Sequence, residues 1–140
     1  MIPRFDSNGN LPKGVHRAKL EDIIKRFGGA GYGVRLTRTT SLKNFVDTAS
    51  PYIQAIYIDG SYITTKLAPG DVDLAVIVRD DISQISDGMK QLSLFQAMFK
   101  GDLHIYYFKN GSVPLADMVK FWTKDRDGHL KFIVYLEVKK

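Results

Sequence analysis

The segment 71–78, with the sequence Asp-Val-Asp-Leu-Ala-Val-Ile-Val, restricts the fold more than any other part of the chain. Its β-branched and aliphatic residues predict a β-strand. Asp71 follows Pro69-Gly70 and would suit a turn cap at the start of that strand. Asp73 has no such explanation, because an unpaired carboxylate inside an apolar strand costs several kcal/mol. The strand is therefore expected to carry Asp73 for a chemical reason.

Other segments predict helices and further strands around this one. Apolar residues at helical spacing or in β-branched runs predict helices over 17–27, 41–48, 82–100 and 114–122, and strands over 53–59, 102–108 and 130–138, after a loop over 5–14. This order predicts an α/β (α+β) fold with a mixed β-sheet flanked by helices. A chain of 140 residues without an internal repeat or an interdomain linker predicts a single domain, residues 1–140.

Positive charge is concentrated at the amino-terminal end. Residues 1–50, a basic loop and helical region, carry nine Lys/Arg against four Asp/Glu, a balance of +5, while residues 51–140 carry eleven of each sign. This region would hold a polyanion beside a separate chemical site, or it provides solvated helix faces.

Composition excludes several classes of protein. The absence of cysteine rules out disulfides, thiolate zinc sites and a cysteine nucleophile. No stretch approaches 18 apolar residues, and the first residues lack the pattern of a signal peptide, so we expect a soluble cytoplasmic protein without membrane contact.

Two sets of polar residues lie at the ends of the predicted strands 53–59 and 71–78. Asp71 and Asp73, two residues apart in a strand, point to the same face, and two nearby carboxylates need a cation between them. Gly60-Ser61 follows the other strand and offers backbone N–H groups and a hydroxyl to a phosphate. Hard oxygen ligands beside a phosphate-binding turn predict Mg²⁺, with Mn²⁺ as the alternative, holding a nucleoside triphosphate.

The arrangement of these residues resembles a known superfamily. Gly60-Ser61, nine intervening residues and then Asp71-Val72-Asp73-Leu74 are similar to the Gly-Ser…Asp-x-Asp motif of the nucleotidyltransferases that include DNA polymerase beta and the minimal nucleotidyltransferases. More narrowly, the chain resembles an uncharacterised bacterial family of nucleotidyltransferase-like proteins at Phe5-Asp6, Gly9-Asn10-Leu11-Pro12, Gly14-Val15-His16-Arg17, Tyr57-Ile58-Asp59-Gly60-Ser61, Asp125-Arg126-Asp127-Gly128 and Lys131.

The resemblance implies transfer of a nucleoside monophosphate from a triphosphate to a hydroxyl, with metal ions on three carboxylates. Asp71 and Asp73 match the first two, and Asp102, which begins the next strand, is our choice for the third. Tyr62 is expected to stack on the base and Lys66 to contact the triphosphate, beside Gly60 and Ser61 in the phosphate-binding turn.

Two functions remain open on the sequence. One is a Mg²⁺-dependent nucleotidyltransferase that uses a nucleoside triphosphate to modify an RNA such as tRNA, or a protein. Related small proteins resemble the nucleotidyltransferase half of toxin–antitoxin pairs, which implies a helical partner, and a homodimer is the alternative. The other function is a catalytically degenerate nucleotidyltransferase fold that acts as an antitoxin-like or regulatory binding module.

Overall fold

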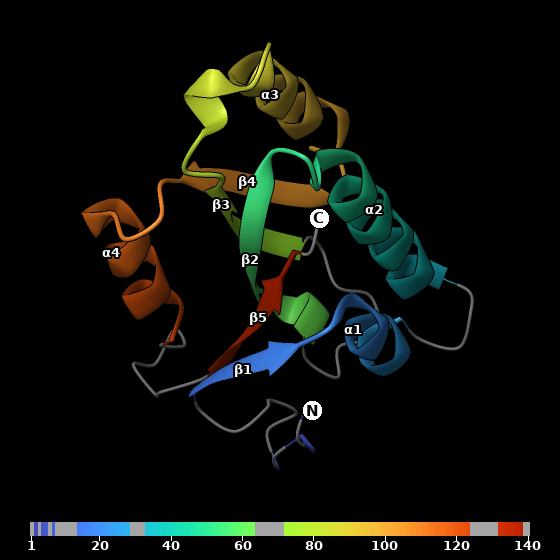
Figure 1. Cartoon of the computed structure of the whole chain (residues 1–140). Helices are drawn as coiled ribbons and strands as arrows, with labels where there is room; N and C mark the ends of the chain where they lie inside the picture. The colour runs from blue at the N-terminus through green and yellow to red at the C-terminus, as the bar shows by residue number, and fades with distance from the viewer. Residues whose placement is uncertain are drawn as a thin grey trace.

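Five strands form one mixed β-sheet through the centre of the molecule (Figure 1). The computed structural model describes residues 2, 4–5, 7, 14–28, 33–63, 72–123 and 132–138. The strands are β1 (Gly14–Ala18), β2 (Ile53–Asp59), β3 (Val72–Val78), β4 (Leu103–Phe108) and β5 (Phe132–Glu137), in the sheet order β1-β5-β2-β3-β4. Strand β2 pairs antiparallel with both β3 and β5, whereas β1 pairs parallel with β5 and β4 parallel with β3.

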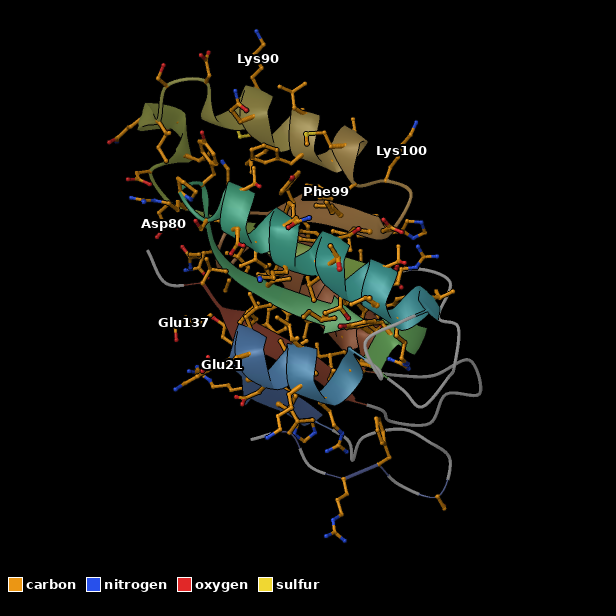
Figure 2. All side chains as sticks on the ribbon, turned by 90° about the vertical axis from the view of Figure 1, so that its right-hand side faces the viewer. Glu21, Asp80, Lys90, Phe99, Lys100 and Glu137 are labelled. Carbon is orange, nitrogen blue, oxygen red and sulfur yellow. The ribbon has the colours of Figure 1, made fainter. Side chains whose placement is uncertain are left out.

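Helices cover the two faces of this sheet unequally. They are α1 (Leu20–Phe27), α2 (Gly33–Ala49), α3 (Gly88–Met98) and α4 (Val113–Trp122), with the short 3₁₀ helices η1 (Ser61–Ile63) and η2 (Ile82–Gln84). Figure 2 shows α1, α2 and α3 side by side over one face, and Figure 1 shows α4 alone on the other. The predicted single-domain α+β fold with a mixed sheet between helices is confirmed. None of the described helices is long and apolar enough to span a membrane.

Alternation along the strands divides the apolar interior into two parts. In β3, the even-numbered residues pack with the buried side chains of α1, α2 and α3, while Ala75 and Ile77 pack with Leu115 and Trp122 of α4. Asp73 shares the parity of Ala75 and Ile77, so it lies on the α4 face of the sheet.

The amino-terminal strand was not predicted. The sequence predicts a loop over 5–14 and a helix over 17–27, but Gly14–Ala18 form β1, which pairs with β5, and the helix starts only at Leu20. The segment has one large apolar residue, Val15, and it is about half exposed. Its strand structure therefore comes from pairing with a segment more than 100 residues away, which local patterns do not reveal.

The second helix is longer than predicted. Threonines weaken a helix because of their branched side chains, which argued for a start near residue 41, yet α2 begins at Gly33. Two of these hydroxyls bond to carbonyl oxygens one turn earlier: Thr37 Oγ1 donates to Gly33 O at 3.4 Å and Thr39 Oγ1 to Arg35 O at 2.8 Å. Such bonds satisfy the threonine side chains within a helix.

The predicted helix over 82–100 is instead two helices. η2 ends at Gln84 and α3 starts at Gly88, after Asp87 in the left-handed conformation with φ 57°. A Cβ atom at Gly88 would lie 2.9 Å from the Ile82 side chain, so the break is packed tightly. The apolar spacing continues across the break and conceals it in the sequence.

Candidate functional site

Three polar residues form a row across the sheet. Asp73 of β3 lies opposite Asp59 in the antiparallel pairing with β2 and opposite His104 in the parallel pairing with β4. Residues opposite each other on neighbouring strands point to the same face. The row therefore lies on the α4 face, at the edge of the sheet where β2 ends and where β3 and β4 begin.

The three members of the row differ in exposure. Asp59 is buried, with 5% of its surface exposed, whereas the side chains of Asp73 and His104 are 33% and 47% exposed. His104 Nδ1 lies 3.2 Å from Asp73 Oδ1, so in the tautomer with a proton on Nδ1 the imidazole donates to the carboxylate. Asp73 is thus oriented by a neighbouring strand and remains open to solvent.

Sequence reasoning gave Asp59 no role. The residue was visible at the end of a buried strand and directly before Gly60, but its approach to Asp73 depends on the register between β2 and β3. A signal was available: an antiparallel pairing of these two strands brings the last residue of one near the first residues of the other.

The chain turns sharply after Asp59. Gly60 has φ +97°, a backbone conformation that residues other than glycine rarely adopt. Ile63 N donates to Gly60 O at 3.3 Å as η1 begins. The turn is attached to α2 by Arg35, whose Nη1 donates to Tyr62 O at 2.7 Å and to Phe27 O at 3.0 Å. Burial lowers the pKa of Arg35, with the nearby Tyr62 acting in the opposite direction.

Tyr62 does not fit the base-stacking role expected of it. Its ring is completely buried and lies against Phe27, with the centroids 5.8 Å apart. Its hydroxyl is 2.6 Å from Thr39 Oγ1, and burial raises its pKa against the opposing effects of that hydrogen bond and of Arg35. A base cannot reach this ring in the observed arrangement. Tyr62 instead anchors the Gly60–Ser61 turn to α1 and α2.

The Asp102 carboxylate bonds to α2, although its backbone lies beside the start of β3, where Val72 N donates to Asp102 O at 3.1 Å. It lies in the turn before β4, where Ser41 Oγ donates to its Oδ2 at 2.6 Å and Arg38 forms an ion pair with its Oδ1. Arg38 and Ser41 belong to α2, whose buried residues pack on the sheet face opposite to the one that carries Asp73. The Asp102 carboxylate therefore joins the sheet to α2, which is not the place expected of the third carboxylate.

Part of the expected site lies outside the described residues. This applies to Asp71 and Lys66, while Gly60 and Ser61 are placed at the turn where β2 ends. Within the described ranges, no three acidic or histidine side chains are grouped closely enough to hold a metal ion. Mg²⁺ commonly binds to one or two carboxylates together with substrate phosphates and water. The oxygen donors of Asp59 and Asp73 beside the Gly60 turn fit that mode.

The basic amino-terminal region has several structural contacts. Arg17 lies over the ring of Tyr135 at 5.2 Å and Arg26 over the ring of Phe5 at 4.6 Å, in addition to the bonds of Arg35 and Arg38. These four cations contribute to the fold as well as to the charge of the surface.

Comparisons with known proteins identify a family without a known activity. A model described as a family of unknown function (DUF6932) matches residues 3–137, so the chain belongs to that family. No curated protein and no solved structure gives a significant match.

Proposed function

We propose that this member of the DUF6932 family is a Mg²⁺-dependent nucleotidyltransferase, with Mn²⁺ as an alternative ion. It would transfer a nucleoside monophosphate from a nucleoside triphosphate to a hydroxyl group. The observation that carries the proposal is the register pair of Asp59 and Asp73 on one face of the sheet, directly before the Gly60 turn.

Each residue near the turn has a distinct task in this proposal. The backbone N–H groups after Gly60 would bind the β- and γ-phosphates, with Arg35 and Tyr62 holding the turn in place. Asp59 and Asp73, together with Asp71, would hold the metal ion, which supplies charge stabilisation to the phosphate oxygens. His104 would act as a positioning residue that orients the Asp73 carboxylate.

The proposed transfer is a substitution at the α-phosphorus. A bond forms between the acceptor oxygen and phosphorus, and the bond from phosphorus to the pyrophosphate oxygen breaks. Pyrophosphate leaves with the bonding electrons. The acceptor proton passes to the Asp59 carboxylate and then to water. In the resembled superfamily, the third carboxylate has this task.

The acceptor we propose is an RNA such as tRNA, with a protein hydroxyl as the alternative. The excess positive charge of residues 1–50 supports a polyanionic acceptor. A helical, toxin-like partner or a second copy of the chain is the proposed interaction partner. The cytoplasm, where nucleoside triphosphates and RNA occur together, is the proposed compartment.

A second function is favoured by the position of Asp102. Because Arg38 and Ser41 engage its carboxylate on the α2 side, Asp102 is less available as a third metal ligand. A catalytically degenerate member that binds nucleotides and acts as an antitoxin-like or regulatory module is therefore the alternative.

Label transfer separates the two functions. The purified protein is incubated with each α-³²P-labelled nucleoside triphosphate, with Mg²⁺ or Mn²⁺, and with total bacterial RNA and protein. The proposal predicts labelled RNA or protein with the wild type and none with Asp73→Asn or Asp59→Asn. Nucleotide binding without any label transfer would instead favour the binding module.

A further inference from the structure

A second feature of the α4 face is a cavity of about 490 Å³ between α4 and the sheet. Tyr57 of β2 and Tyr135 of β5 line its sheet side, with ring centroids 4.9 Å apart and planes inclined by 58°. Ile77 and Leu115 are among its apolar lining residues. Both rings are partly exposed, so a planar ligand has access to them.

The charge among the described lining residues of the cavity is positive. The charged residue among its described lining residues is Lys120 of α4, and Asn110, Ser112 and Thr123 add hydrogen-bonding groups. Arg17 contributes a second cation beside the Tyr135 ring, at 5.2 Å from its centroid. Burial raises the pKa of Tyr135 most, Tyr57 and the nearby acidic residue Glu137 raise it further, and Arg17 lowers it, so the phenol is neutral near pH 7. Aromatic surface with nearby cations favours a flat ligand that bears a negative charge.

Tyr57 connects the cavity to the row of Asp59 and Asp73, neither of which lines it. Tyr57 lies two residues before Asp59 on β2, and strands rise about 3.4 Å per residue, so the ring lies about 7 Å along the sheet from the carboxylates. Gly60 lies on the other side of Asp59. A ligand in the cavity would thus approach the carboxylates from the direction opposite to the phosphate-binding turn.

We propose that this cavity binds a nucleotide through its base and through a phosphate on its ribose. Its volume is within the range of about 300–1,000 Å³ that is typical of small-molecule sites. The base would stack on Tyr57, and Lys120 would pair with the phosphate. The nucleotide comes either from the donor triphosphate or from the end of an acceptor RNA. This inference deepens the proposed function, since the cavity would hold one of the two reactants beside Asp73.

Binding of two probes to the full chain tests the cavity without requiring turnover. ATP with Mg²⁺ is followed by calorimetry, and an octaadenylate RNA labelled with fluorescein by anisotropy. The variants are Tyr57→Leu, which removes the aromatic ring, and Lys120→Ala, which removes the charge at an exposed position. Tyr57→Phe retains the ring and should retain binding even if Tyr57→Leu folds poorly.

Matched controls lie on the opposite face. Tyr52→Leu removes a ring that packs against Phe95, and Lys90→Ala removes a lysine of α3 that points away from the sheet (Figure 2). Circular dichroism and urea denaturation verify that each variant is folded. The controls should bind both probes as the wild type does.

The cavity proposal predicts about tenfold weaker binding of at least one probe by Tyr57→Leu. For Lys120→Ala it predicts about threefold weaker binding with a reduced dependence on salt. Weaker ATP binding identifies the donor nucleotide as the ligand, and weaker octaadenylate binding alone identifies the acceptor. The proposal is overturned if neither probe binds to the wild type, or if the cavity variants bind as the controls do. If the wild type binds a probe and the cavity variants bind it more weakly, but no label is transferred from the nucleoside triphosphate, the transferase proposal is refuted and the cavity proposal is retained.

Discussion

Asp59 and Asp73 are direct cross-strand neighbours at the edge of the sheet, one buried and the other one-third exposed. Like charges in this position destabilise an antiparallel pair unless something compensates them. The imidazole of His104, whose Nδ1 lies 3.2 Å from Asp73 Oδ1, offers Asp73 one such contact. A divalent cation bound by the two carboxylates would stabilise the folded state further.

The first prediction concerns the response of stability to a metal ion. In EDTA, Asp73→Asn should change the free energy of unfolding by less than about 1 kcal/mol, because it removes one of two like charges but also weakens the contact with His104. With millimolar Mn²⁺ the melting temperature of the wild type should rise, since the ion binds the folded state, and that of the variant should not. Differential scanning fluorimetry measures both. An equal Mn²⁺ shift in the two proteins would place the ion elsewhere.

The second prediction concerns the ion pair of Arg38 and Asp102. Because both side chains are mostly buried and Ser41 adds a hydrogen bond, a double-mutant cycle with Arg38→Met and Asp102→Asn should give a coupling of about 1–2 kcal/mol. The pair of Arg79 and Asp81, which is local and more exposed, should give less than about 1 kcal/mol. Urea denaturation measures both cycles, and equal couplings would refute a special role for the first pair.

The third prediction concerns the turn at Gly60. Its φ of +97° makes Gly60→Ala unfavourable by about 1–3 kcal/mol. Nucleotide binding should also weaken, because the backbone N–H groups that follow would shift. Gly101→Ala serves as the matched control: a Cβ there meets nothing within 4 Å, and its stability should change by less than about 0.5 kcal/mol. Similar losses in both variants would argue against a strained turn.

The fourth prediction concerns alkaline pH. Burial raises the pKa of Tyr107 well above its ordinary value of about 10, and its hydroxyl donates to Leu92 O at 2.7 Å. Above pH 10 the unfolded chain releases this proton while the folded chain retains it, so stability falls with pH by up to about 1.4 kcal/mol per unit. Tyr107→Phe should be about 1 kcal/mol less stable than the wild type at pH 8. The difference in the free energy of unfolding between the two proteins should be smaller at pH 11 than at pH 8. A difference that does not change with pH would contradict this account.

The sequence predicted the central part of the fold because its signals are local. The strands over 53–59 and 71–78 are rich in β-branched and aliphatic residues, and β2 and β3 match them over the described residues, which do not include residue 71. β1 was missed because its residues are mostly exposed and acquire strand structure through β5. The break at Asp87 was missed because the apolar spacing continues through it.

The candidate site was predicted in part for a related reason. Asp73 and Gly60 stood out because a carboxylate in an apolar strand and a glycine at a strand end are locally unusual. The surroundings of Asp59 and Asp102 were not predicted, because they are tertiary features. Asp59 lies opposite Asp73 through the strand register, and Asp102 bonds to α2. The burial of Tyr62 likewise follows from its packing against Phe27 and Thr39.

Electron paramagnetic resonance of Mn²⁺ in the presence of ATP tests the central claim most directly, because it reports the bound ion without requiring turnover. The wild type, Asp73→Asn and Asp102→Asn are titrated under the same conditions. We predict that Asp102→Asn binds Mn²⁺ as the wild type does and that Asp73→Asn binds it at least about tenfold more weakly, the loss expected when a charged ligand is removed. Loss of binding in Asp102→Asn with retention in Asp73→Asn would contradict the site proposed here.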